Sequence, residues 1–309
     1  MNTGNHAETR ISGMYLAYGG KEATVPIVEE DFEFSSLDGL CLRGTLTAPQ
    51  TAQGVAVLTH GGGVTRDEGG FFTRLSAALS RAGIAALRFD MRGHGASEGR
   101  QEDLTLASVA NDIRAATGAL LGRFPNVDRA HLVGASFGGG ITAIAAGRAP
   151  ELVSSIVLFN PLLDYKARFI DQKPYWRDNR IAAAEATDLT RDGFLPHSPT
   201  FKLGRPLLNE VFQVCPAEYL ARVVQPTLIV HGTGDTFIPV DSSRTHLRRI
   251  AAPVKRLLEI EGAQHGIAVH DDPQYAHPQT QAWQREAIGA VTAWMAEHGE
   301  GTADAKPQP

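Results

Sequence analysis

The stretch LVGASFGGG, residues 132–140, decides how this chain is interpreted. An apolar run ends at Gly134, Ser136 follows, and a glycine triplet begins at Gly138. A G-x-S-x-G pattern between a strand and a helix is typical of a sharp turn that lifts a serine hydroxyl out of the sheet edge. The serine backbone is strained there, so the residues two before and two after it must be small. The pattern predicts that Ser136 is a nucleophile; the alternative is a glycine-rich turn that binds nothing.

The same spacing occurs a second time, at residues 95–99 around Ser97. A nucleophile turn needs a core strand directly before it and a helix directly after it. HLVG precedes Ser136 without a gap, and FGGGITAIAAG follows it with small residues at helical spacing. The strand before Ser97 ends near Asp90, and the next helical pattern begins only near Asp103. We therefore predict that Ser97 is a loop serine.

The composition is that of an ordinary globular protein. The 309 residues are 43% hydrophobic and 20% charged, the net charge is −5, and no basic block indicates a nucleic-acid partner. Cys41 and Cys215 are far apart in the chain, which favours two free thiols in a reducing cytoplasm. The first 20 residues do not have the pattern of a signal peptide. No apolar run reaches the roughly 20 residues that span a bilayer, and we expect a cytoplasmic protein without a membrane span.

Short apolar runs alternate with helical patterns along the chain. Runs that are apolar on both faces are typical of strands buried between two helix layers. We therefore predict an α/β fold, with a mostly parallel central sheet of about eight strands, helices on both faces and an antiparallel hairpin at the sheet edge. The expected strands are 27–34 and 40–47 for the hairpin, then 54–61, 84–90, 130–134, 153–160, 226–231 and 254–260; the expected helices are 71–81, 103–121 and 137–147.

One interval, from about Leu163 to Val224, contains no strand-like run. A connection of roughly 60 residues is too long for a plain crossover between two strands. We predict that residues 163–224 form an inserted, mainly helical cap; the alternative is an ornate crossover helix with a long surface loop. The remaining predicted parts are an α/β core at 27–162 and 225–298, an N-terminal extension at 1–26 and a disordered tail at 299–309.

Two further strand ends carry side chains that activate a serine. Acyl transfer needs a base and an acid that orients it, and on this kind of fold the acid and then the histidine follow the serine along the chain. Asp235 comes three residues after the end of the run PTLIVHG, and His265 comes five residues after the end of VKRLLEI. Because the carboxyl ends of parallel strands meet at one edge of a sheet, the sequence predicts a triad of Ser136, His265 and Asp235.

Other acidic and histidine side chains fit the triad less well. Asp241 is the alternative acid, but it lies at the expected start of a helix, where an aspartate is a routine cap. His270 lies in HDDPQYAHPQ, which has the composition of a surface loop; a metal site with its neighbouring aspartates is the alternative to a solvated pair. His94 and His131 are interpreted as structural.

A glycine triplet, Gly61 to Gly63, follows His60 directly after a central strand. Glycines at this position let backbone amides approach an oxyanion, and the amide of Phe137, the residue after the nucleophile, is the predicted second donor. A glycine triplet alone is typical of a flexible turn, but its place after this strand favours an oxyanion loop. Gly61 and Gly63 are predicted to border the substrate.

Taken together, these motifs resemble the α/β-hydrolase superfamily over residues 27–298. Within it, the chain is most similar to capped serine esterases, a group that includes bacterial feruloyl esterases and monoacylglycerol lipases. The resemblance implies Ser136 as nucleophile, His265 as base and Asp235 as its partner, and it assigns an oxyanion-hole amide to Gly62. The motifs are HGGG at 60, DMRGHGAS at 90, GASFG at 134, HGTGDTFIP at 231 and GAQHG at 262.

The predicted activity is hydrolysis of a carboxylic ester or thioester of a small molecule through an acyl-enzyme, which requires no metal or organic cofactor. The alternatives are a thioesterase or acyltransferase acting on a natural-product intermediate, an amidase or peptidase, and a non-catalytic ligand-binding protein on the same fold. Tyr165, Tyr175 and Trp176 are candidate walls of the substrate pocket, with packing inside the cap as the alternative. The sequence leaves the oligomeric state open, a homodimer included.

Overall fold

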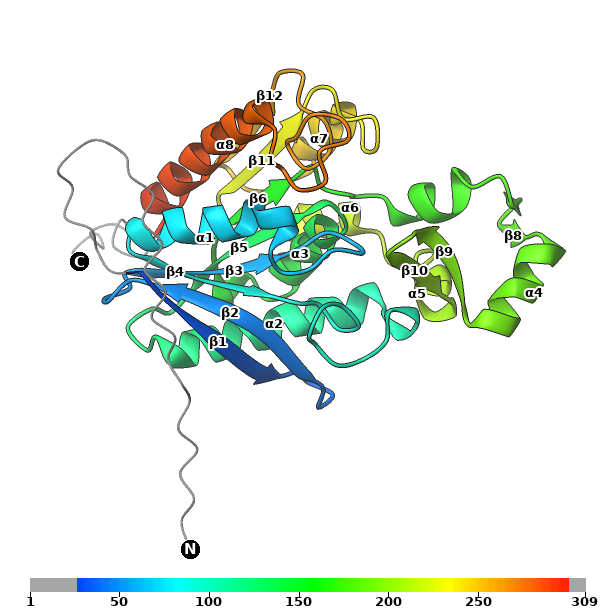
Figure 1. The fold of residues 1–309 in the computed structure, drawn as a ribbon, viewed down its shortest axis with the longest axis horizontal. Helices are drawn as coiled ribbons and strands as arrows, with labels where there is room; N and C mark the ends of the chain where they lie inside the picture. The colour runs from blue at the N-terminus through cyan, green and yellow to red at the C-terminus, as the bar shows by residue number, and fades with distance from the viewer. Residues whose placement is uncertain (1–26, 300–309) are drawn as a thin grey trace, which may run out of the picture.

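The computed structural model describes residues 27–299 of the chain. The predicted N-terminal extension, residues 1–26, and the predicted tail beyond residue 299 lie outside the described residues. A central sheet with helices on both sides forms the larger part of the molecule, and a smaller group of helices and short strands projects from one end of it (Figure 1). None of the described helices combines the length and the apolar character needed to cross a membrane.

The central sheet has eight strands in the order β1-β2-β4-β3-β5-β6-β11-β12. β2 pairs antiparallel with β1 and β4, and the other pairs are parallel, which confirms the predicted edge hairpin and mostly parallel sheet. All residues of β3, β4, β5 and β11 are buried, as strands covered on both faces are. The strands are β1 (Val28–Ser35), β2 (Cys41–Ala48), β3 (Gly54–Thr59), β4 (Ile84–Phe89), β5 (Ala130–Ala135), β6 (Val153–Phe159), β11 (Thr227–Gly232) and β12 (Lys255–Ile260).

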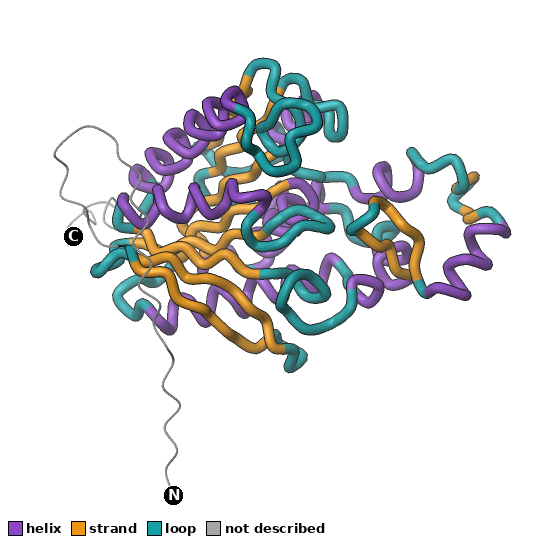
Figure 2. The backbone as a smooth tube through the Cα atoms, viewed as in Figure 1, coloured by secondary structure: helices purple, strands orange, loops and turns teal. Residues whose placement is uncertain are grey.

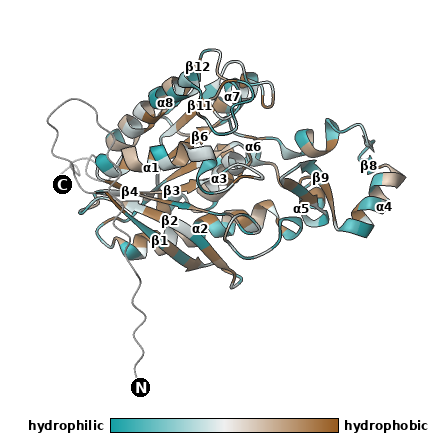
Figure 3. Ribbon diagram, viewed as in Figure 1, coloured by the Kyte–Doolittle hydropathy of each residue, from teal (hydrophilic) through white to brown (hydrophobic). Residues whose placement is uncertain are grey.

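Two helical layers cover the sheet because its central strands are apolar on both faces. In β3, Val55 and Val57 belong to the apolar cluster that includes α2 and α3, whereas Ala56 and Leu58 belong to the cluster that includes α1 and α8. Figure 3 shows hydrophobic colours on parts of the central strands and polar colours on parts of the surrounding helices. The helices are α1 (Phe71–Arg81), α2 (Leu106–Arg123), α3 (Ser136–Arg148), α7 (Val240–Leu247) and α8 (Pro278–Glu297).

The helix expected from residue 103 begins slightly later, at Leu106. Thr105 is its N-cap: its side chain accepts a hydrogen bond from the Ser108 amide, and the Ser108 side chain accepts one from the Thr105 amide, both at 3.0 Å. This reciprocal capping box satisfies two helix-end amides and fixes the start of α2.

Most of residues 163–224, called the cap segment, lies beyond the end of the sheet at which β6 stops, while its residues 216–222 pack against α3 (Figure 1 and Figure 2). The expectation that this interval contains no strand was wrong, because four short strands form two antiparallel pairs there. Two of these strands have only two residues each, and β9 contains a proline, so no apolar alternation marks them. The elements are η4 (Ala167–Asp171, a π-helix), β7 (Trp176–Arg177), β8 (Arg180–Ile181), α4 (Ala183–Asp192), β9 (Phe194–Ser198), β10 (Phe201–Gly204), α5 (Arg205–Glu210), α6 (Pro216–Tyr219) and η5 (Leu220–Arg222).

Candidate active site

Ser136 stands at the junction where β5 ends and α3 begins. Its φ of 49° lies in the left-handed region, which strains a residue that carries a side chain. The flanking glycines leave no room for a Cβ atom: one added at Gly134 would lie 2.3 Å from Thr142 Oγ1, and one added at Gly138 would lie 2.3 Å from the His60 carbonyl oxygen. The local structure is therefore the tight strand–turn–helix that the sequence predicts.

Loops that leave three different strands bring Ser136, His265 and Asp235 together. The Nε2 atom of His265 lies 2.9 Å from Ser136 Oγ, and its Nδ1 atom lies 2.8 Å from Asp235 Oδ2. When Nδ1–H donates to the carboxylate, Nε2 is left as the acceptor for the serine proton. The side chain of His265 is 31% exposed and that of Asp235 is fully buried. A substrate therefore has access to the histidine, while the acid is shielded from water.

Asp235 is held as a carboxylate although it is buried. Burial raises the pKa of this side chain, but hydrogen bonds from His231, His265 and a backbone amide, together with the charge of His265, bring the pKa well below its usual range. Its Oδ1 atom accepts two amides of the following loop, at 2.8 and 2.9 Å, and its Oδ2 atom accepts the side-chain amide of Asn160 at 2.6 Å. These contacts fix the carboxylate in the orientation that holds the imidazole.

The loop after β3 leaves one of its three glycine amides without an acceptor. Gly61 donates its amide to Glu68 Oε2 at 2.7 Å, and Gly63 donates its amide to His94 Nε2 at 3.2 Å. Within residues 27–299, the amide of Gly62 between them has no hydrogen-bond acceptor. An unused amide next to a nucleophile is the arrangement that an oxyanion hole needs.

His60 anchors this loop to the core. Its Nε2 atom accepts the amide of Met91 at 3.0 Å, and its Nδ1–H donates to the Gly61 carbonyl at 2.7 Å. Burial, together with the neighbouring His94, lowers the pKa of His60 to about 3. The ring is therefore neutral at pH 7, in the one tautomer that satisfies both partners.

Phe137, the residue after Ser136, connects α3 to the cap segment. Its amide lies in the first turn of α3, where N–H groups have no partner within the helix. The Tyr165 hydroxyl donates to the Phe137 carbonyl, and the rings of Tyr165, Phe169 and Phe201 lie 5.2, 6.2 and 5.0 Å from the Phe137 ring. Tyr165 is fully buried, which favours packing behind the nucleophile turn over a place on the pocket wall.

Glu68 is a buried carboxyl group that the sequence analysis did not single out. It begins the short turn η1 (Glu68–Gly70) and accepts the Gly61 amide. Burial raises its pKa, while the Gly61 hydrogen bond and the charge of His265 lower it by less. A Cβ atom added at Gly61 would lie 3.4 Å from both Glu68 Oε1 and Ser136 Cβ, so this carboxyl group supports the loop directly behind the nucleophile.

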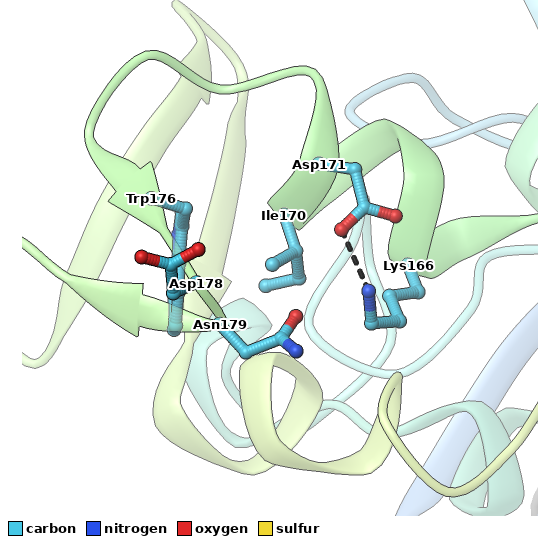
Figure 4. Close-up of a pocket in the computed structure, with 6 residues that line it drawn as sticks. All are labelled: Lys166, Ile170, Asp171, Trp176, Asp178 and Asn179. Atoms are coloured by element: carbon cyan, nitrogen blue, oxygen red, sulfur yellow. Dashed lines mark hydrogen bonds and ion pairs between the residues drawn. The ribbon is translucent and has the colours of Figure 1, made fainter.

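Trp176 lines a separate cavity of about 320 Å³ in the cap segment (Figure 4). Its ring also lies 5.9 Å from that of Phe212, and the adjacent Tyr175 is partly buried against the same apolar cluster. The cavity is lined by Lys166, Ile170, Asp171, Trp176, Asp178 and Asn179, none of which belongs to the triad or to the loop after β3. The structure therefore does not bring Trp176 to the nucleophile.

The aromatic side chain nearest to His265 is one that the sequence analysis left unassigned. Phe237 lies with its ring centre 4.8 Å from that of His265, and it is 39% exposed. The guanidinium carbon of Arg168 lies 3.7 Å from the centre of the Phe237 ring, and the His197 ring lies 6.2 Å from it. Arg168 and His197 come from the cap segment, far from Phe237 in the sequence, so no local pattern marks this contact.

Ser97 and His270, which the sequence predicts to lie in loops outside the triad, do lie in loops. The Ser97 hydroxyl donates to the Asp90 carbonyl at 2.6 Å and accepts the Arg43 amide at 2.9 Å, as a loop serine does. His270 forms an exposed pair with Asp271 at 3.4 Å. Among the residues that the structure describes, no group of three or more His, Cys, Asp or Glu side chains could hold a metal ion.

The fold and this constellation define an α/β hydrolase. The model of the family described as "Serine aminopeptidase, S33" matches residues 50–272, which is more than half of the chain and includes all three triad positions. The chain belongs to this family, and it is accordingly a hydrolase.

The chain is similar to proteins of known structure or activity. A monoacylglycerol lipase of Mycolicibacterium smegmatis is 26% identical over an alignment of 299 positions that covers 89% of this chain and 99% of that protein. The polyketide transferase af380 of Aspergillus fumigatus is 31% identical over 142 residues, 45% of this chain and 47% of that protein. Est1E of Butyrivibrio proteoclasticus, solved with ferulic acid bound, has a TM-score of 0.65 and 21% identity over 84% of this chain and 99% of its own. At that identity, the structural likeness shows the fold.

Proposed function

We propose that this protein hydrolyses a carboxylic ester or thioester of a small molecule through an acyl-enzyme on Ser136. The observation that carries the proposal is the continuous hydrogen-bond chain from Ser136 Oγ through both ring nitrogens of His265 to the Asp235 carboxylate, at 2.9 and 2.8 Å. A nucleophile, a base and a buried acid in this order form the constellation of acyl transfer.

In the acylation step, Ser136 Oγ attacks the acyl carbonyl carbon while its proton passes to His265 Nε2. The amides of Gly62 and Phe137 hold the oxyanion of the tetrahedral intermediate. When the intermediate collapses, the bond to the leaving group breaks, and His265 gives its proton to the departing alcohol or thiol. Asp235 stabilises the imidazolium without taking the proton.

In the deacylation step, water attacks the acyl-Ser136 ester. His265 accepts a proton from the water and returns it to Ser136 Oγ, and the carboxylic acid leaves. The partial exposure of His265 gives water a route to Nε2. Each bond and proton is accounted for by this chain, the substrate and water, so the reaction requires no cofactor.

The near-full-length likeness to a monoacylglycerol lipase supports oxygen esters as the first substrate class. A second candidate is acyl transfer from a thioester to an acceptor other than water. The likeness to a polyketide transferase over about half of the chain supports this second candidate.

The test compares three substrates with one acyl group: 4-nitrophenyl butyrate, the butyryl thioester of N-acetylcysteamine, and butyryl-4-nitroanilide. We expect hydrolysis of the oxygen ester, a weaker or absent reaction with the anilide, and a butyryl adduct on Ser136 after an acid quench. Transfer of the butyryl group to an added alcohol in preference to water favours the second candidate. Stoichiometric binding of these compounds without turnover contradicts both.

A further inference from the structure

A cationic side chain of the cap segment lies one aromatic ring away from His265. Arg168, in the π-helix η4, has its guanidinium carbon 3.7 Å from the centre of the Phe237 ring. The same ring lies 4.8 Å from the ring of His265, which contacts Ser136 Oγ. Phe237 therefore links the guanidinium to the triad as an apolar spacer.

Most donors of this guanidinium have no acceptor among the described residues. Its Nη1 atom donates to Gln172 Oε1 at 3.3 Å, and its Nε atom is buried without a partner. A guanidinium has five N–H donors. Burial lowers the pKa of Arg168, and the negative charge of Asp235 opposes this effect. No carboxylate within residues 27–299 lies at ion-pair distance from Arg168.

Lys173 and His197 extend this group, and we call the three residues the basic wall. The Lys173 ammonium is partly buried, and burial together with the charge of Arg168 lowers its pKa. The pKa of His197 is lowered to about 4 by burial and by the charges of Lys173 and Arg168. Its Nδ1 atom is also buried without a partner. The basic wall therefore consists of two cations and one neutral imidazole.

Three other cations of the cap segment have acidic partners: Lys166 with Asp171 at 2.6 Å, Arg191 with Asp188 at 2.9 Å, and Lys202 with Glu102 at 3.9 Å. A partly buried cation without an acidic partner is costly to the fold. An anionic group on a ligand offsets that cost, and a carboxylate matches the planar fork of an arginine.

We propose that the basic wall binds a carboxylate on the substrate, so that the preferred ester carries a carboxylate a few methylenes from its scissile carbonyl. The Phe237 ring then contacts the methylenes between the two groups, and the Arg168 fork receives the carboxylate. This inference rests on the proposed function, because it names the substrate class of the Ser136 site.

The test compares matched esters that differ in one charge. The acyl-side pair is mono-4-nitrophenyl glutarate and its methyl ester; the alcohol-side pair is the butyryl ester of 4-hydroxybutyrate and its methyl ester. We expect kcat/KM for the anionic member of one pair to exceed that for its neutral partner by about tenfold, because its carboxylate accepts charge-assisted hydrogen bonds from Arg168. Arg168→Gln is expected to lower this ratio about tenfold and Lys173→Gln to lower it less. Arg180→Gln, at an exposed arginine of β8, is the matched control and leaves the ratio as it is in the unmodified protein.

A second readout is independent of turnover. Calorimetric titration of the Ser136→Ala protein with mono-4-nitrophenyl glutarate is expected to give a Kd that rises about tenfold when Arg168→Gln is added. Thermal unfolding of each variant checks that the cap segment is folded. Equal ratios and equal Kd values with and without Arg168→Gln overturn the inference. If neutral esters are hydrolysed and anionic ones are not preferred, the inference fails while the proposed function stands; if neither ester is hydrolysed but binding depends on Arg168, the proposed function fails instead.

Discussion

The two G-x-S-x-G turns of this chain have the same spacing and opposite surroundings. At residues 95–99, the Ser97 hydroxyl donates a hydrogen bond to the Asp90 carbonyl and accepts one from the Arg43 amide. At residues 134–138, the Ser136 hydroxyl bonds to the imidazole of His265. The comparison teaches that the spacing marks a tight turn, and that the strand before it and the helix after it decide whether the hydroxyl is available.

The glycines of the two turns also serve different purposes. Gly95 and Gly99 have φ values of +50° and +95°, which favour glycine for its backbone conformation. Gly134 and Gly138 are needed because neighbouring backbone and side-chain atoms lie where a Cβ would be. Gly95 is also closely packed, since a Cβ added there would lie 2.3 Å from Asp90 Cγ. The first turn therefore needs glycine for its positive φ as well as for space, whereas the second needs it for space alone.

The largest expected effect separates the two serines. Ser136→Ala removes the nucleophile, and kcat/KM for 4-nitrophenyl butyrate is expected to fall by about 10⁵-fold or more. Steady-state kinetics measures this loss, and an unchanged thermal midpoint shows that the fold is intact. A residual rate within about tenfold of the unmodified enzyme would remove Ser136 from the mechanism.

The acid of the triad gives the next largest effect. Asp235→Asn keeps the shape of the side chain but no longer fixes the His265 tautomer, so kcat is expected to fall by roughly 10⁴-fold. Asp241→Asn is the matched control, since Asp241 pairs with Arg244 in the first turn of α7. The control is expected to change kcat by less than about threefold and to cost under about 1 kcal/mol of stability. A large loss in the control and none at Asp235 would reverse the assignment.

The close packing around Gly138 predicts an effect on both stability and activity. Gly138→Ala places a Cβ against the His60 carbonyl, and urea unfolding is expected to show a loss of about 1–3 kcal/mol together with reduced activity. Gly118→Ala, in α2, meets nothing within 4 Å and is expected to stabilise the protein by up to about 1 kcal/mol. Equal effects of the two substitutions would contradict the close approach at the nucleophile turn.

The smallest effect is expected at the second turn. Ser97→Ala removes two hydrogen bonds to the backbone and is expected to cost about 1–2 kcal/mol of unfolding free energy. Its kcat/KM is expected to stay within about twofold of the unmodified enzyme, because Ser97 contacts no triad residue. A loss of activity without a loss of stability would contradict the interpretation of Ser97 as a loop serine.

The sequence predicts the sheet and the approach of the triad because both depend on local patterns. Ser136 and Asp235 follow the buried strands β5 and β11, and His265 follows the partly exposed edge strand β12. Parallel strands present their carboxyl ends at one edge of a sheet. The edge hairpin and the mostly parallel sheet follow from the same runs, and the structure confirms them.

What the sequence does not predict depends on contacts between distant segments. The strands β7 to β10 are too short to show alternation, and they form only as pairs. Glu68 is positioned by its hydrogen bond from the Gly61 amide, and Arg168 is positioned by its contact with the Phe237 ring. Sequence periodicity does not indicate such contacts. The support of the loop after β3 by Glu68 and the basic wall are therefore seen only in the folded chain.

The measurement that tests the central claim most directly is labelling with a fluorophosphonate probe, followed by peptide mapping with mass spectrometry. The account predicts one adduct, on Ser136, that is lost in the His265→Ala protein because the base is gone. An adduct on Ser97, or labelling of Ser136 that does not depend on His265, would contradict the account.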